Sequence, residues 1–111
     1  MTKPNFFAKA GATPWTDVAP GARRRVLLFT EQLMQVEFGF DAGAVGALHS
    51  HPHVQSSYVL EGRFEVTIAG ATEIIGTGGS FIVPSGLVHG VKALEAGRLV
   101  DSFTPARIDF L

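Results

Sequence analysis

The fold of this chain follows from one stretch of residues, Leu48-His49-Ser50-His51-Pro52-His53-Val54-Gln55. A second stretch supplies another histidine further along: Pro84-Ser85-Gly86-Leu87-Val88-His89. Because His49 and His51 are separated by one residue, both imidazoles point to one face if the segment is a strand. Gln55 has the same parity, although Pro52 interrupts the strand. Imidazoles that converge inside a β-barrel can hold a divalent transition metal, so the two stretches together predict a metal site.

All 4 histidines fall within these two stretches. A histidine-rich tract can also be a surface feature that binds nothing. The metal is favoured here because three histidines occupy five positions, beside residues that are typical of turns and strands.

Length and composition predict one globular domain, residues 1–111. The chain is 46% hydrophobic and only 17% charged, below the usual charged fraction of about 25%. A net charge of −1 gives no basis for binding to nucleic acid or to a membrane surface. The only basic run is Arg23-Arg24-Arg25, which we expect to be a solvated loop that leads into a strand.

The location and assembly of the protein are predicted from what the sequence lacks. There is no cysteine, hence no disulfide, thiolate ligand or cysteine nucleophile. The first ten residues lack the apolar stretch of a signal peptide, and no segment approaches the length of a membrane span. We therefore expect a cytoplasmic protein. The low charged fraction and the apolar terminal segments predict a homodimer, because such surfaces need a cover.

Alternation of apolar and polar residues predicts an all-β fold. Residues 34–40 alternate with a period of two, and residues 64–68 do the same. Shorter apolar runs occupy residues 26–29, 58–60, 74–75, 81–83 and 99–100, and glycine-rich turns separate them. Strand signals at this spacing are typical of a sandwich or barrel.

The two ends of the chain do not follow this pattern. Residues 1–22 contain three prolines and Trp15, with no clean period; we expect them to wrap the barrel or to pair with a second subunit. The tail after Phe103 ends in apolar residues, and an apolar terminus is more often packed than free.

Two motifs in the centre of the chain resemble the cupin family. The first is made by Gly43, His49, His51, Gln55 and Gly62, and the second by Gly78, Pro84, Gly86 and His89. The chain departs from the family at Gln55, where glutamate is usual, and at Ala93, where asparagine often closes the second motif. The resemblance implies an all-β, cupin-type jelly-roll β-barrel with a metal inside, bound by His49, His51, Gln55 and His89.

This implied ligand set carries no negative charge. Three neutral imidazoles and one neutral amide oxygen leave the full double charge on the metal, so the centre should attract an anionic substrate and polarise it as a Lewis acid. The cofactor is expected to be a divalent transition metal, with nickel, zinc, manganese and iron all open. We expect His53 to be a rim residue, because Gln55 fits the ligand spacing better.

A closer resemblance, to the KdgF group of cupins, lies in the segment from Asp101 to Leu111. Similar segments occur along nearly the whole chain: Pro14-Trp15, Arg23-Arg24, Leu33-Met34, residues 58–62 and residues 84–95. That group converts unsaturated uronates, released by pectin and alginate lyases, to the linear 5-keto sugar acid. The resemblance implies a small sugar acid as substrate, Asp101 and Arg107 as the reactive pair, and Phe103 shaping the pocket.

The chemistry of these side chains suits such a reaction. Asp101 and Phe103 share one face of a strand, and a carboxylate in an apolar barrel can transfer a proton. Arg107 can hold a substrate carboxylate with two hydrogen bonds. Spacing alone favours surface positions for Asp101 and Arg107, and the resemblance reverses that preference.

The function expected from the sequence is therefore a metal-dependent conversion of 4,5-unsaturated monouronates by hydration or tautomerisation and ring opening. One alternative is an Fe(II) cupin dioxygenase, because a three-histidine neutral site also suits iron and oxygen chemistry. The other is a sugar-binding cupin without catalysis. The fold alone does not choose among them.

Overall fold

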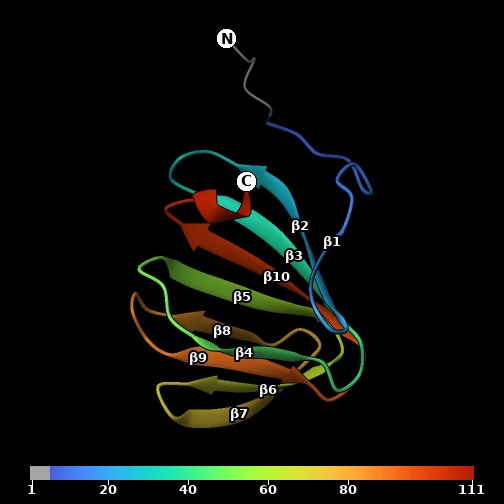
Figure 1. The fold of residues 1–111 in the computed structure, drawn as a ribbon, viewed down its shortest axis with the longest axis vertical. Helices are drawn as coiled ribbons and strands as arrows, with labels where there is room; N and C mark the ends of the chain where they lie inside the picture. The colour runs from blue at the N-terminus through green and yellow to red at the C-terminus, as the bar shows by residue number, and fades with distance from the viewer. Residues whose placement is uncertain (1–5) are drawn as a thin grey trace.

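The structure, a computed structural model, describes residues 6–111 as two antiparallel sheets that face each other. The larger sheet has the strand order β1-β2-β3-β10-β5-β8, and the smaller has the order β4-β9-β6-β7 (Figure 1). The strands are β1 (Thr16–Ala19), β2 (Ala22–Phe29), β3 (Met34–Phe40), β4 (Val45–His49), β5 (Val54–Glu61), β6 (Arg63–Ile68), β7 (Ala71–Gly76), β8 (Ser80–Val83), β9 (His89–Ala93) and β10 (Gly97–Thr104). A short 3-10 helix, η1 (Ile108–Phe110), follows them.

The all-β jelly-roll fold predicted from the sequence is confirmed. Strand β10 lies in the middle of the larger sheet, between β3 and β5, although it follows every other strand along the chain. Its inward residues therefore lie at the centre of the barrel, where the two sheets face each other. Within residues 6–111, no helix has the length and apolar character needed to cross a membrane.

The core forms two apolar clusters, and the candidate site lies where they approach each other. The period-two alternation of β3 buries Met34, Val36 and Phe40, as expected. Phe40 belongs to a cluster built around Val59, Phe64 and Leu99, and Met34 and Val36 belong to one with Phe103 and Ala106. The two clusters give the barrel a rigid apolar wall on either side of the site.

The basic run Arg23-Arg24-Arg25 is not a solvated loop, so that expectation was wrong. It lies in β2, where alternation separates the three side chains. Arg25 forms an ion pair of 2.8 Å with the buried Glu37, and its guanidinium carbon lies 4.1 Å from the centre of the Trp15 ring. The run can form a strand because a carboxylate and an aromatic ring on neighbouring segments stabilise its charges.

Part of the N-terminal segment also forms regular structure. Strand β1 pairs with β2 at the edge of the larger sheet, so this part of residues 1–22, expected to wrap the barrel or to pair with a second subunit, extends the sheet of its own chain. Residues 8–13 line a cavity together with Arg25, Glu37 and Arg98, which agrees with a wrap along the outer face. Residues 1–5 lie outside the described residues.

The C-terminal tail packs at one position and is exposed at others. The ring of Phe110 meets those of Phe38 and Phe103 edge-on, at centroid distances of 6.2 and 5.8 Å. Ile108 and Leu111 are exposed. The predicted packing of the tail is therefore right for Phe110 and wrong for the last residue.

Candidate metal centre

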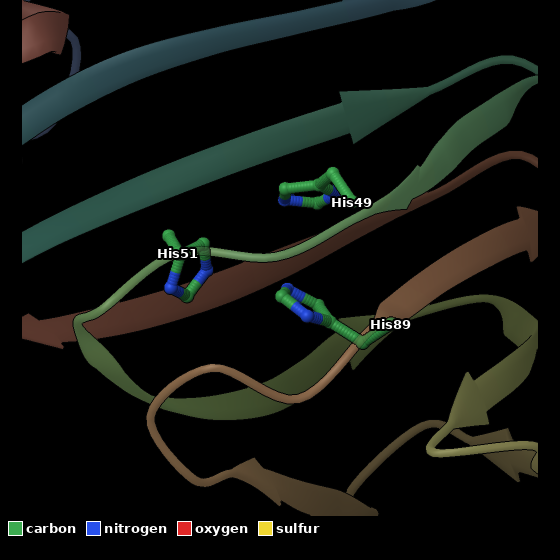
Figure 2. Close-up of side chains that lie close together, drawn as sticks. All are labelled: His49, His51 and His89. Atoms are coloured by element: carbon green, nitrogen blue, oxygen red, sulfur yellow. The ribbon is translucent and has the colours of Figure 1, made fainter.

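Three histidines from separate segments turn their imidazoles toward one point (Figure 2). His49 ends β4 and His89 begins β9, and the two are register partners across these strands. Gly90 allows the close approach, because a Cβ there would lie 2.8 Å from the Gly46 carbonyl oxygen of β4. His51 lies in the loop before β5, not on one strand with His49 as parity had suggested. Pro52, which has no N–H to donate to a ladder, accounts for this break.

The backbone fixes the tautomer of all three rings. Each Nδ1 lies 2.8 to 3.0 Å from a backbone carbonyl oxygen: that of Ala47 for His49, of His53 for His51 and of Leu87 for His89. Because a carbonyl oxygen can only accept, each Nδ1 must carry the hydrogen. Each Nε2 is then left with a free lone pair, which is the form that binds a metal.

These lone pairs fit a divalent cation. The ligand atoms of the three residues all lie within 4.8 Å of one another. The Nε2 of His89 is buried and has no hydrogen-bond partner anywhere in residues 6–111. Burial is the largest cause that lowers the pKa of His51 and of His89, so both rings stay neutral and able to coordinate. Imidazole ligands suit zinc, copper, iron and nickel.

Gln55 is placed to supply a fourth ligand atom. Its Oε1 lies 3.0 Å from the Nε2 of His51. With the hydrogen on Nδ1, the neutral His51 ring turns an Nε2 lone pair toward this oxygen. Two ligands of one cation, each about 2.1 Å from it, can lie this close together. The contact is therefore explained by a shared cation.

Two hydrogen bonds fix the orientation of the Gln55 amide. Its Nε2 donates to the Ser57 hydroxyl oxygen at 3.0 Å and to the Asp101 Oδ2 at 3.2 Å. Both amide hydrogens are thus used, and Oε1 faces His51. A glutamate at position 55 would instead bring two carboxylates together at the Asp101 contact, where like charges repel. The departure from the usual glutamate therefore suits the neighbouring acid.

Asp101 is a buried acid beside this centre. It lies on β10 opposite Ser57 of β5, with 5% of the residue exposed. Burial raises the pKa of Asp101 from 3.8 to about 7, while a hydrogen bond from Ser57 and the charge of Arg107 oppose the rise. Its Oδ1 is buried and has no partner within the described part of the chain. Asp101 can therefore gain or lose a proton near neutral pH.

The predicted catalytic residues lie around a cavity of about 210 Å³. Its wall includes His49, Gln55, His89, Asp101, Phe103 and Arg107. The Arg107 guanidinium donates to both carboxylate oxygens of Asp109, at 3.1 and 2.9 Å. Its central carbon lies 5.0 Å from the Phe103 ring centre and 4.2 Å from that of Phe110. The structure thus brings together every residue that the sequence predicted for the site.

His53 lies outside the group of three ligands. Its ring is 5.6 Å from that of His51, and its backbone carbonyl accepts the hydrogen bond from the His51 Nδ1. Its contact with the site is thus through the main chain, which agrees with a rim position for the side chain.

The sequence analysis missed several residues of the cavity wall, among them Arg24 and Phe110. Arg24 could have been found from parity, because it shares a strand face with the buried Ala22 and the partly buried Val26. The alternation was overlooked because the run Arg23-Arg24-Arg25 was interpreted as a solvated loop. Phe110 carried no signal beyond the apolar character of the tail.

Comparison with known proteins gives matches along the whole chain. The family model described as Cupin domain matches residues 36–103. The pectin degradation protein KdgF of Dickeya dadantii is 41% identical over 101 residues, which cover 89% of this chain and 92% of that protein. KdgF from Halomonas sp. has a solved structure with a TM-score of 0.91 and 40% identity, covering 96% of this chain and 99% of that one. An RmlC-like cupin from Shewanella frigidimarina NCIMB 400 gives a TM-score of 0.94 and 40% identity, with both chains covered in full.

We expect His89→Ala to weaken metal binding strongly, because it removes one of the three converging lone pairs. The loss should at least equal the roughly 10- to 100-fold that follows when a supporting partner of a ligand is removed. Metal content after purification, measured by mass spectrometry of the elements, checks this. His53→Ala is the matched control and should bind metal like the wild type. Equal loss in both variants would contradict the ligand set.

We also expect Asp101 to give metal-free protein a characteristic dependence of stability on pH. The pKa of Asp101 is about 7 in the folded protein and 3.8 ordinarily, so between these values the folded state holds a proton that the unfolded chain has lost. This acid therefore makes stability fall as pH rises through that window, by up to about 1.4 kcal/mol per pH unit.

Urea unfolding of metal-free wild type and Asp101→Asn at pH 5 and pH 8 isolates this effect. The lowered pKa values of His51 and His89 act in the opposite direction, but they are common to both proteins. The asparagine variant should gain stability over the wild type as pH rises. A stability difference that stays constant from pH 5 to pH 8 would show that Asp101 does not hold its proton.

Proposed function

Because this chain belongs to the cupin family and to its KdgF-like group, we propose that it is a metal-dependent enzyme of pectin degradation. Its reaction is the conversion of 4,5-unsaturated monouronates to the linear 5-keto-4-deoxyuronate. The observation that carries the proposal is the hydrogen bond between Gln55 and Asp101. It joins a candidate metal ligand to an acid whose pKa lies near 7, inside one cavity.

The size of the cavity supports a single sugar unit as substrate. Its volume of about 210 Å³ lies below the roughly 300 to 1,000 Å³ of sites that hold drug-sized ligands. A uronate monomer is small enough for such a space, whereas an oligosaccharide would need an open groove. The ring of Phe103 gives the sugar an apolar face to lie against.

His49, His51, His89 and Gln55 would hold the metal. A divalent cation bound there would supply Lewis-acid polarisation of a substrate oxygen. Since the four ligands are neutral, the site keeps a positive charge that favours an anion. The exposed position of His49 leaves one side of the group open to the substrate.

Asp101 acts as the general acid and base. Hydration and tautomerisation of the 4,5-double bond both place a proton on C4 and end with a carbonyl at C5. The Asp101 carboxyl gives the proton to C4, and the proton released by the attacking water or by the enol hydroxyl restores it. An acid with a pKa near the working pH is best suited to both transfers.

Arg107 orients the anion. Its guanidinium lies on the cavity wall against Phe103, and Asp109 holds it there through two hydrogen bonds. A guanidinium kept in place loses little freedom when a carboxylate binds, so it can position the sugar for the reaction at C4 and C5.

The metal-loaded protein should remove the 230 nm absorbance of an unsaturated monouronate, because that absorbance comes from the conjugated 4,5-double bond. Asp101→Asn should keep its metal and lose about 10²- to 10⁴-fold in rate, as expected for a general acid and base. Arg107→Ala should raise KM, since it removes a carboxylate partner from substrate and transition state alike.

Ser102→Ala is the matched control, because Ser102 neighbours Asp101 on β10 and lies on the opposite face. It should keep wild-type activity. Full activity of Asp101→Asn would exclude the proton transfer assigned to this residue. Oxygen uptake in place of absorbance loss would favour a dioxygenase, and tight binding of a sugar without turnover would favour a binding cupin.

We also propose that the protein is a homodimer that pairs through the outer face of the larger sheet. Tyr58 and Leu60 of β5 and Ile82 of β8 are exposed on neighbouring strands of this sheet. Exposed apolar side chains gathered on one face indicate a contact with another chain. A second copy of the chain suits this face, because it would present the same exposed apolar side chains in return.

Ile82→Lys should convert the dimer to a monomer, because it places a charge in the apolar contact. Light scattering at micromolar concentration should give twice the chain mass for the wild type and the single-chain mass for the variant. Ile74→Lys, at an exposed position on the smaller sheet, is the control and should stay dimeric. A wild-type mass equal to one chain would rule out the dimer.

A further inference from the structure

Among the described residues, Arg24 is the one arginine that forms no ion pair. The other five each form an ion pair: Arg23 with Asp41, Arg25 with Glu37, Arg63 with Glu95, Arg98 with Glu37 and Glu61, and Arg107 with Asp109. The Arg24 side chain forms neither an ion pair nor a hydrogen bond within residues 6–111. A charge left without a partner on a protein that pairs all its other arginines calls for a ligand.

The position of Arg24 places this charge inside the candidate site. Its strand partner is Phe38 of β3, which in turn pairs with Leu99 of β10, and all three line the cavity. Burial is the largest cause that lowers the pKa of Arg24, and the charge of Asp109 opposes it, so the guanidinium has given up part of its hydration without a hydrogen bond to replace it. A partly desolvated cation gains most from an anion that enters the cavity.

Arg24 and Arg107 contact the same aromatic ring. Their guanidinium carbons lie 3.9 and 4.2 Å from the centre of the Phe110 ring. The two carbons are therefore at most about 8 Å apart, a span that one carboxylate bridges with a charge-assisted hydrogen bond to each. Phe110 keeps both side chains against the cavity wall.

We propose that Arg24 is a specificity-determining residue, the second half of a carboxylate clamp with Arg107. This inference rests on the proposed function, since it concerns the acid group of the same substrate. Asp109 forms its ion pair with Arg107 and acts on Arg24 only through its charge, without an ion pair or a hydrogen bond. The substrate carboxylate can therefore supply the ion pair that Arg24 lacks in the protein.

The clamp explains how a uronate is selected over a neutral sugar. A neutral sugar of the same shape leaves the Arg24 charge partly desolvated and unpaired, which costs free energy that a carboxylate recovers. A neutral sugar is thus disfavoured because the Arg24 guanidinium stays unpaired, and not because of a steric clash. Arg24 should therefore govern the ratio of acid to neutral sugar binding.

Calorimetry of metal-loaded protein with galacturonate and with galactose tests the clamp without any turnover. Wild type should bind galacturonate more tightly than galactose. Arg24→Gln should weaken galacturonate binding roughly 10- to 100-fold, as expected for the loss of a hydrogen bond to a charged group, and leave galactose binding unchanged. Arg23→Gln is the matched control, since the neighbouring arginine pairs with Asp41 away from the cavity.

A second variant guards against a defect in folding. Arg24→Lys keeps the charge and loses the planar fork, so it should bind galacturonate with an affinity between those of wild type and Arg24→Gln. In turnover of the unsaturated uronate, Arg24→Gln should raise KM and leave kcat within a few-fold. A purely structural role would lower the affinity for both sugars and the melting temperature together, and would overturn the clamp.

Two further results separate this inference from the proposed function. If Arg24→Gln binds galacturonate as tightly as the wild type, the clamp is wrong, while turnover of the unsaturated uronate by wild type would still support the proposed function. If wild type prefers neither sugar and converts no unsaturated uronate, both the clamp and the substrate class are wrong.

Discussion

The site depends on one contact between two strands that are distant in sequence, the hydrogen bond from the Gln55 amide to the Asp101 carboxylate. On one side, the amide turns its oxygen toward the three imidazoles. On the other, the carboxylate is kept in a buried place where its pKa rises to about 7. Strands β5 and β10 must pair in this register for both conditions to hold, because Ser57 and Asp101 are direct partners. The orientation of the Gln55 amide thus depends on Asp101, and the surroundings of the Asp101 carboxylate depend on Gln55.

The two sheets contribute different chemistry. His49 and His89 come from the smaller sheet, while Gln55, Asp101, Phe103 and Arg24 come from the larger one. The cavity between them is closed at its sides by the apolar clusters around Phe40 and Phe103. The geometry of the site therefore depends on the packing of the core. A core substitution that shifts one sheet relative to the other would also change the distance between the candidate metal ligands and Asp101.

The sequence predicted those features that depend on local patterns. The alternation of residues 34–40 can be read directly from the sequence, and the three histidines converge even though β4 ends at His49. Features that depend on distant partners were not predictable. The run Arg23–Arg25 forms a strand because Glu37 and Trp15 stabilise its charges, and neither neighbour can be read from the run. Arg24 is of the same residue type as its two neighbours and differs from them in the strand face that it occupies.

The central position of β10 has a consequence for folding during synthesis on the ribosome. Until this strand leaves the ribosome, β3 and β5 have no partner on their inner edges, and the three histidines of the candidate metal site are already present in the nascent chain. Two open strand edges lined with apolar residues invite pairing with other nascent chains. A polypeptide released before Asp101 is added would thus carry all three histidines, lack the strand that closes its sheet, and depend on chaperones for its solubility.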